Sequence, residues 1–173
     1  MKTIFRKLSF SLGMIGVLVG LVACVGLSAA RIASAASVHK MTLVMKEFKF
    51  EPSKVQLKVG EQVELTIRNA GQVSHDWMAG RGLVNTTEEK GFRTDLVALL
   101  KPTETGRQYA TERVGMASKA DSIKRISGGD EIEPGGQVTL RFTVPATAKG
   151  EWSMGCLMTG HYESGMKGTI IVK

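Results

Sequence analysis

The chain has 173 residues, with 23 lysines and arginines against 16 acidic residues and a formal net charge of +7. This length holds one ordinary domain once a targeting segment is set aside, and a second independent core is not expected. Four of the basic residues precede residue 36 and every acidic residue follows it. Residues 36–173 therefore have a net charge of +3. No block of Lys and Arg interleaved with aromatic residues indicates nucleic-acid binding.

Residues 1–35 have the pattern of an export signal. Lys2, Arg6 and Lys7 precede an apolar run from Leu8 to Ala30, and the first acidic residue is Glu47. Positive charges followed by an apolar segment are typical of chains that leave the cytoplasm. We therefore expect an extracytoplasmic protein, in the periplasm or on the outer face of the cytoplasmic membrane.

Three fates remain open for this segment. Residues 21–24 resemble a bacterial lipobox, which would make Cys24 a lipidated residue. Residues 33–35 equally suit ordinary signal peptidase, which would leave a mature chain that begins at Ala36. The run also exceeds the roughly 20 apolar residues that span a bilayer, so it would serve as an uncleaved anchor. Because two of the three fates tether the protein, we expect membrane association.

The first predicted strands lie between Met41 and Asn69. Apolar residues alternate with polar ones over residues 55–59 and again over residues 63–67, with Gly60 and Glu61 between the two runs. Alternation of this kind indicates two half-buried β-strands on either side of a turn.

The pattern weakens over about residues 81–130. Charges of both signs and scattered glycines fill this stretch, and Leu96 to Leu100 is its one compact apolar run. We interpret it as a long insertion with one short helix. Connections beyond roughly 12 to 15 residues that lack regular structure are commonly functional loops or disordered segments.

The last third returns to the strand pattern. Residues 134–136, Pro-Gly-Gly, predict a turn, and apolar residues alternate from Val138 to Val144 before Pro145. A final strand is predicted over residues 169–172. Short strands with this spacing favour an all-β fold, a Greek-key β-sandwich over residues 36–173.

Cysteine usage adds a constraint. If Cys24 is removed or lipidated, Cys156 is the only thiol of an exported domain, where oxidising conditions favour paired cysteines. An inert buried thiol, a pairing between chains and a metal thiolate all remain open at this point.

The positions of the histidines help to decide among these three roles of Cys156. His75 follows the predicted strand that ends at Asn69, while His161 has four residues between it and Cys156 and four between it and Met166. A lone His or Met is usually ordinary packing, but two imidazoles, a thiolate and a thioether together suit copper that changes between Cu(II) and Cu(I). We expect His39 to be solvent-exposed without partners. Met154 and Met158, which flank the thiol, are expected in the core and at the rim.

Residues 155–169 closely resemble the ligand loop of cupredoxins, the blue type 1 copper proteins, and residues 69–75 resemble the segment that carries the family's first ligand. The loop spacing is similar to auracyanin, rusticyanin and sulfocyanin rather than to plastocyanin or azurin. The resemblance covers about residues 40–80 and 132–173. It implies a cupredoxin-like fold and one type 1 copper per chain, with four ligands: His75, Cys156, His161 and Met166.

One departure concerns the residue after the first ligand. Plastocyanins and azurins carry an amide side chain there, whereas this chain has Asp76. A carboxylate accepts backbone N–H bonds but donates none unless it is protonated, so the bonding around the copper ligands is expected to differ.

The resemblance implies an electron carrier that is not an enzyme, because four protein ligands leave no open position for a substrate. A multicopper oxidase would need further histidine pairs, and only His39 is left over.

The expected partners are membrane cytochrome complexes or terminal oxidases, and the protein is expected to be a monomer. His161 would present its ring edge within a docking patch of four residues: Met158, Thr159, Gly160 and Tyr162. The alternative is a copper-binding chaperone or storage protein that also uses three methionines: Met78, Met154 and Met158.

Overall fold

The computed structural model describes residues 37–112, 124, 125 and 127–173, and the signal, lipobox and anchor predictions for residues 1–35 lie outside these ranges. Within them the elements follow in this order: β1 (His39–Lys46), β2 (Lys49–Glu51), β3 (Lys54–Leu57), β4 (Gln62–Asn69), β5 (His75–Asn85), β6 (Glu89–Asp95), α1 (Leu96–Leu100), β7 (Thr103–Glu112), β8 (Lys124–Arg125), β9 (Asp130–Thr143), the 3-10 helix η1 (Ala146–Ala148), β10 (Gly150–Gly155) and β11 (Lys167–Val172). Neither helix of this part of the chain has the length and apolarity needed to cross a membrane.

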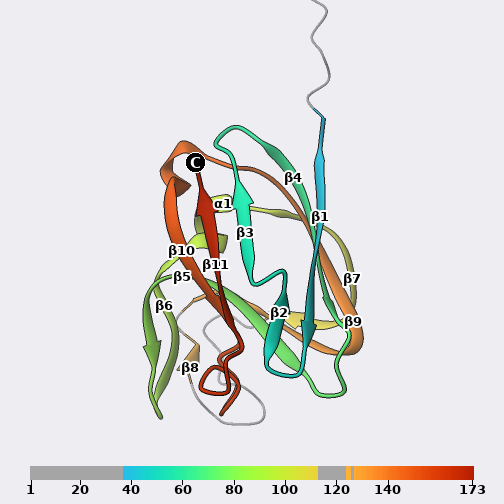
Figure 1. The fold of residues 1–173 in the computed structure, drawn as a ribbon, viewed down its shortest axis with the longest axis vertical. Helices are drawn as coiled ribbons and strands as arrows, with labels where there is room; N and C mark the ends of the chain where they lie inside the picture. Colours follow the sequence, from blue (N-terminus) through green and yellow to red (C-terminus); the bar gives the residue numbers. More distant parts are fainter. Residues whose placement is uncertain (1–36, 113–123, 126) are drawn as a thin grey trace, which may run out of the picture. The chain divides into compact units, whose positions relative to one another are not determined.

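The strands form two sheets that share β5. One sheet contains β2, β1, β4, β9 and β7, and the other contains β10, β11, β3, β6 and β8 (Figure 1). β5 pairs with β9 over His75–Trp77 and with β10 over Met78–Gly80, so it passes from one sheet into the other. Neighbours such as β4 and β9 are distant in sequence, as Greek-key connections require. The predicted all-β sandwich is therefore confirmed.

Alternating apolar residues build the core between the sheets. On β4 and β9 they lie directly opposite one another: Val63 with Phe142, Leu65 with Leu140, and Ile67 with Val138. All six side chains are buried. Because each buried aliphatic or aromatic side chain contributes about 1.5 to 3 kcal/mol, this face supplies much of the force that fixes the register. The first predicted strand is shorter than expected, since β3 ends at Leu57 and Val59 is exposed.

The predicted turn at residues 134–136 is wrong, because these residues lie within β9. Ile132 pairs with Ala110 of β7, and Gln137 pairs with Gln108. Four residues of β9 therefore face one residue of β7, and the extra residues form a bulge rather than a reversal of the chain. Gly135, at φ 78°, adopts the left-handed conformation that the bulge needs.

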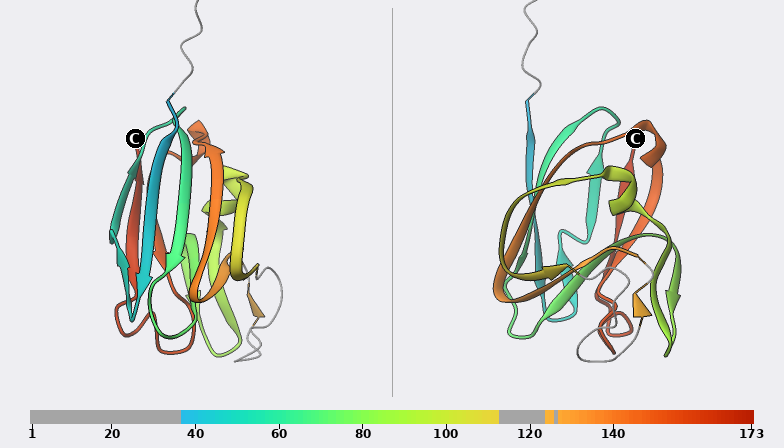
Figure 2. Two further views of the ribbon diagram at one scale, coloured as in Figure 1. Left: turned by 90° about the vertical axis from the view of Figure 1, so that its right-hand side faces the viewer. Right: turned by 180° about the vertical axis from the view of Figure 1, so that it is seen from behind.

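The insertion is more regular than its sequence pattern indicates. Its predicted short helix is confirmed as α1, and part of the remaining chain forms β6 and β7. β7 pairs along β9, and with α1 it lies on the face seen from behind in Figure 2. Most residues of Thr103–Ala110 are exposed, so β7 lacks the periodic apolar signal that marks the inner strands.

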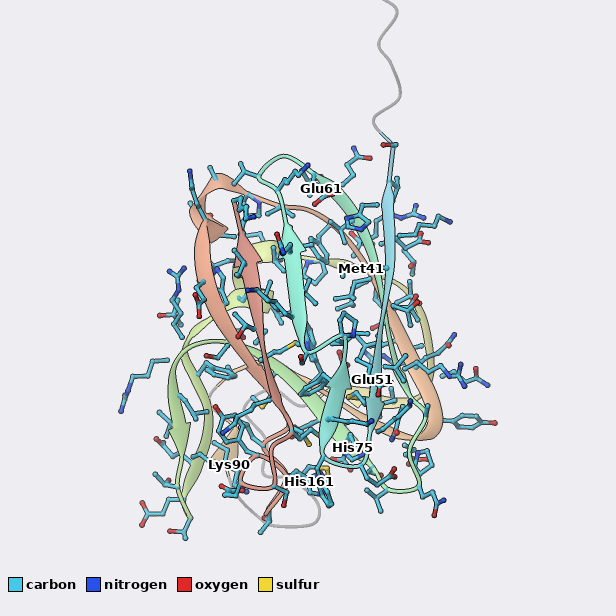
Figure 3. All side chains as sticks on the ribbon, in the orientation of Figure 1. Met41, Glu51, Glu61, His75, Lys90 and His161 are labelled. Carbon is cyan, nitrogen blue, oxygen red and sulfur yellow. The ribbon has the colours of Figure 1, made fainter. Side chains whose placement is uncertain are left out.

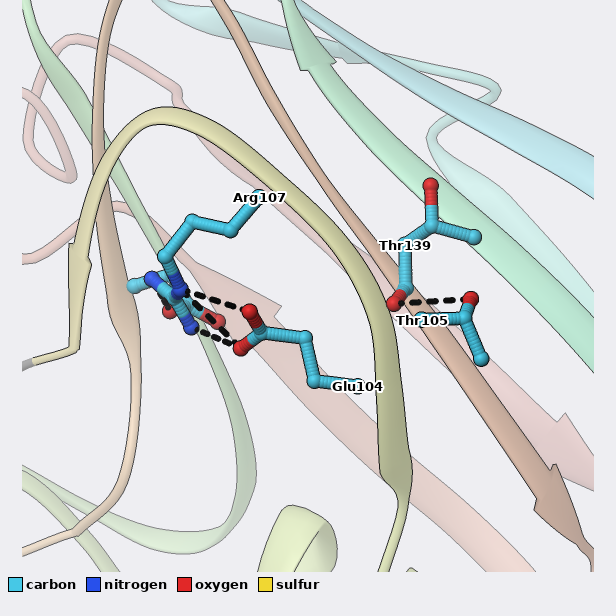
Figure 4. A network of polar contacts seen from close by, with 5 residues as sticks. Glu104, Thr105, Arg107 and Thr139 are labelled. Carbon is cyan, nitrogen blue, oxygen red and sulfur yellow. Dashed lines mark hydrogen bonds and ion pairs between the residues drawn. The ribbon is translucent and has the colours of Figure 1, made fainter.

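Polar contacts attach β7 to the inner sheet. The guanidinium of Arg107 donates to the carboxylate of Glu104 at 3.0 Å and to Asp130 of β9 at 2.7 Å, while Thr105 Oγ1 donates to the carbonyl of Thr139 (Figure 4). The hydrogen bonds from Arg107 to Glu104 and Asp130 raise the pKa of Arg107 against the opposing effect of its burial. β7, a strand with little buried apolar surface, is therefore held to β9 by backbone hydrogen bonds and by the salt bridge between Arg107 and Asp130.

Asp95 connects α1 to the chain before β9. Its Oδ1 accepts the N–H groups of Val97 and Ala98 at 2.8 and 3.3 Å, and its Oδ2 accepts the N–H of Gly128 at 2.6 Å. We expect Asp95→Ala to lower the free energy of unfolding by about 1 to 2 kcal/mol through the lost cap, with a further contribution from Gly128.

Urea unfolding of the metal-free protein measures this effect. Asp95→Asn is the matched control, because its amide oxygen keeps the helix cap while its nitrogen cannot accept from Gly128; it should fall between the wild type and Asp95→Ala. Equal stability of the wild type and Asp95→Ala would contradict a structural role for this carboxylate.

Candidate metal centre

The loop between β10 and β11 is folded by its own backbone hydrogen bonds. The N–H of Cys156 donates to the carbonyl of Met166, the N–H of Met166 donates to that of His161, and the N–H of His161 donates to that of Met158, each at 3.0 Å. The three residues of this loop that the sequence nominates as ligands are therefore linked directly through the main chain. Main-chain bonds therefore help to fix their relative positions.

Glycines allow the loop to turn so tightly. Gly160 and Gly165 have φ values of 83° and 106°, a region that residues with a side chain rarely adopt. At Gly155 a Cβ atom would lie 2.7 Å from the ring of Tyr162, so this ring packs directly against the backbone beside Cys156.

The fourth nominated residue, His75, is positioned by β5. It pairs with Ile132 of β9, and the loop before it is clamped by the buried side chain of Asn69. The amide nitrogen of Asn69 donates to the carbonyls of Val73 and Ile132 at 2.8 Å, and its oxygen accepts the N–H of Gly71 at 2.8 Å. The sequence indicated Asn69 as the end of a strand and as the first residue of the segment that resembles the family's first-ligand segment. Its role as a clamp depends on contacts across the sheet.

Three donor atoms converge at one end of the molecule. The Nδ1 atoms of His75 and His161 are 3.2 Å apart, and the Sγ of Cys156 is 3.3 Å from Nδ1 of His161 (Figure 3). All three atoms lie within 4.8 Å of one another. His75 and Cys156 are fully buried and His161 is partly exposed, so the cluster lies just beneath the surface.

Asp76 joins the two segments that carry these donors. Its backbone N–H donates to Sγ of Cys156 at 3.3 Å, and its carboxylate oxygen accepts the N–H of Leu157 at 2.6 Å. The side chain is 2% exposed. The main-chain N–H of Asp76 and its carboxylate thus both connect the two segments, and toward Leu157 the carboxylate acts as the acceptor that its chemistry allows.

The surroundings favour uncharged donors while no cation is bound. Burial, followed by the nearby Asp76 carboxylate, raises the pKa of the Cys156 thiol. Burial lowers the pKa of both His75 and His161, which keeps their rings neutral with a lone pair to offer. A bound cation would therefore be needed to stabilise the thiolate at neutral pH.

The donor set fits copper. Two nitrogens that bind one tetrahedral metal at about 2.0 Å are separated by about 3.3 Å, which is close to the spacing of the two Nδ1 atoms. One thiolate with two imidazoles is the trigonal set of electron-transfer copper sites, in which a thioether is the weak fourth ligand. Met166 is fully buried, and its main chain bonds to both Cys156 and His161. These four residues would hold the ion.

The predicted docking patch is mixed in exposure. Met158 and Tyr162 are half-buried, while Thr159 and Gly160 are exposed. The structure adds Phe48 to this surface: its ring is 41% exposed and lies edge-on to His161, with the ring centroids 5.2 Å apart. Phe48 could not be nominated from the sequence, because it lies in the β1–β2 turn, far from the ligand loop in the chain.

The sequence also led to predictions for three residues outside the cluster: His39, Met154 and Met158. His39 is exposed as predicted, but it does have a partner, because its Nδ1 lies 2.8 Å from a carboxylate oxygen of Glu61. Glu61 lies toward the opposite end of the molecule from His75 and His161 (Figure 3). Met154 is buried in the core and Met158 is only partly buried, as expected for core and rim positions.

The stability of the metal-free protein should depend on pH through the two cluster histidines. Burial lowers the pKa of His75 and His161 from the ordinary value of 6.5. As the pH falls below that value, the histidines bind protons more readily in the unfolded chain than in the folded chain, so the free energy of unfolding should fall. Urea titrations across this range measure the loss, which should be smaller in His161→Gln. An equal loss in that variant would assign the effect to other groups.

The chain is similar to known copper proteins. The family model described as a cupredoxin-like domain matches residues 16–107, more than half of the chain. A copper-resistant cuproprotein from Pseudomonas aeruginosa is 26% identical over 97% of each chain. Auracyanin A from Chloroflexus aurantiacus is 18% identical with a TM-score of 0.48, covering 79% of this chain and 100% of its own. Rusticyanin from Thiobacillus ferrooxidans is 14% identical with a TM-score of 0.49, covering 79% of each chain.

Proposed function

This chain belongs to the cupredoxin-like family, whose members bind copper, and from that premise we propose that it is an exported protein that carries single electrons between redox partners at the membrane. The observation that supports the proposal is the preorganised cluster of His75, Cys156 and His161. Its donor atoms are already within 4.8 Å of one another, and two of its members are fully buried.

Bound copper would supply a one-electron couple between Cu(II) and Cu(I). The protein's part is to keep the ligands still while that charge changes. The backbone bonds among Cys156, His161 and Met166 fix the loop, and Asp76 locks it to β5 through Leu157. Rigid ligands that suit neither oxidation state alone minimise the rearrangement that accompanies electron transfer. We infer no catalytic role, because four protein ligands leave no position for a substrate.

His161 offers the route to the surface. Its ring is partly exposed and lies edge-on to the exposed ring of Phe48, while Met158 and Tyr162 of the same loop are half-buried. A small patch of this kind suits brief contacts, since weak redox complexes bury comparatively little area. We propose that a membrane cytochrome complex or a terminal oxidase docks there. The export pattern of residues 1–35 supports a location outside the cytoplasm with a membrane tether.

A copper-binding chaperone or storage role is the second candidate. It is favoured by the relative from Pseudomonas aeruginosa, which carries the name copper-resistant cuproprotein and aligns over 97% of both chains. Handing copper to a partner calls for accessible thioethers near the site. Met78 and Met154 are 1% and 0% exposed, so of the three methionines considered only Met158 reaches the surface.

One experiment separates these functions. Copper-loaded, reduced protein is mixed with oxidised cytochrome c and a strong Cu(I) chelator, and cytochrome reduction and chelator colour are followed together. An electron carrier passes one electron per chain to the cytochrome while its copper stays bound. Transfer of the copper to the chelator before the cytochrome is reduced would support the handover role and contradict the carrier. Cys156→Ser is the control that should reduce no cytochrome.

A further inference from the structure

The ring of His75 has a second nitrogen that the metal cluster does not use. Nδ1 faces His161, whereas Nε2 is fully buried and has no hydrogen-bond partner among the described residues. A buried polar atom of this kind is costly. Histidines that bind metals commonly donate their other ring N–H to a carboxylate, a carbonyl or water, which fixes the tautomer and the orientation of the ring.

Glu47 is the carboxylate beside this nitrogen. A Cβ atom built on Gly71 would lie 2.5 Å from Oε1 of Glu47 and 3.1 Å from Nε2 of His75. One point therefore touches both atoms, and the space between them is open only because residue 71 has no side chain. Glu47 lies in the turn between β1 and β2, 28 positions before His75, so no local motif connects the two residues.

The loop that leads to His75 holds this carboxylate in place. The backbone N–H of Gln72 donates a hydrogen bond to Oε1 of Glu47. The same loop is fixed from the other side by Asn69, which binds the main chain of Gly71 and Val73. The bond from Gln72 is the main cause that lowers the pKa of Glu47, so the group is a carboxylate at neutral pH.

We propose that Glu47 is a positioning residue for His75: its carboxylate attracts the Nε2–H group across the space that Gly71 leaves open, and it places a negative charge behind this copper ligand. The inference rests on the copper site proposed above. With its proton on Nε2, the ring has Nδ1 free to face Cys156 and His161. A negative charge behind a ligand favours the more positive oxidation state, so Glu47 lowers the reduction potential.

The test is voltammetry of the copper-loaded full chain at low and high salt. Glu47→Gln should shift the ratio of Cu(II) to Cu(I) affinity by between about threefold and tenfold toward Cu(I), which raises the potential by about 28 to 59 mV for a one-electron couple. Because Glu47 is exposed, its charge is screened by salt, and the difference from the wild type should shrink at 1 M salt.

Two further variants sharpen the result. Glu61→Gln removes a carboxylate toward the opposite end of the molecule (Figure 3) and should leave the potential unchanged. Gly71→Ala would put a methyl group between Glu47 and His75, so it should raise the potential as Glu47→Gln does.

The results distinguish a failure of the proposed function from a failure of the role assigned to Glu47. A wild-type protein that binds no copper would defeat the proposed function. A wild-type protein with the expected copper site, and a Glu47→Gln variant that matches Glu61→Gln, would overturn the role of Glu47 alone. A shift of equal size at both salt concentrations would overturn the electrostatic effect.

Discussion

Cys156→Ser should abolish the intense visible absorption of the copper-loaded protein. That band arises from charge transfer between a thiolate and copper, and a serine hydroxyl is a harder, weaker donor that cannot replace it. Residual copper binding through His75 and His161 is expected, since both Nδ1 atoms remain in place. The visible spectrum and the copper content of the two proteins, measured side by side, test this prediction.

The chain contains its own matched control. Cys24 is the only other cysteine, and Cys24→Ser should leave the absorption unchanged. Circular dichroism of both variants checks that the β-sandwich is intact. A full band in Cys156→Ser, or its loss in Cys24→Ser, would remove Cys156 from the ligand set.

Met166→Leu should raise the reduction potential. Leucine has similar bulk and apolarity, so the fully buried site should repack at small cost. What disappears is the weak sulfur donor, which Cu(II) needs more than Cu(I). Losing a contact worth on the order of 1 to 2 kcal/mol would shift a one-electron couple by about 40 to 90 mV.

Met166→Gln tests the same position in the opposite direction. A harder oxygen donor favours Cu(II), so the potential should fall below that of the wild type. Voltammetry on the three proteins under one set of conditions should give reduction potentials that rise in the order Met166→Gln, wild type, Met166→Leu. Identical potentials would mean that Met166 only packs the core and that another group occupies the fourth position.

The inner strands could be predicted from the sequence because burial imposes a period of two. Val63, Leu65 and Ile67 alternate in the chain, and the structure buries all three. The bulge in β9 could not be predicted in the same way. Pro134 and Gly135 are typical of turns, but pairing with β7 on both sides keeps the strand running in one direction.

The insertion could be predicted from the sequence only in part. One short helix was predicted within the insertion, and α1 forms at its one compact apolar run, Leu96–Leu100. β7 left no comparable signal, since most of its residues are exposed and its attachment depends on Arg107 and on the ladder to β9. A strand that buries neither face carries no apolar alternation, because that alternation arises from burying one face.

Three of the four proposed ligands could be recognised in the sequence because their types and spacing occur together in one loop, and His75 could be added because it follows a predicted strand. Their supporting residues were accessible only in part. Asp76 could be singled out because it follows His75 directly, whereas Asn69 and Glu47 act across the fold. No local pattern marks a side chain whose role is to hold a loop that belongs to another strand.

A copper titration of the wild-type protein, followed by its visible spectrum, tests whether the chain holds a type 1 copper site. We expect an intense visible band that grows to one equivalent of Cu(II) per chain, with the narrow copper hyperfine splitting of a thiolate-bound type 1 site in electron paramagnetic resonance. A protein that stays colourless, or that binds copper with only the wide splitting of nitrogen and oxygen ligands, would contradict this assignment.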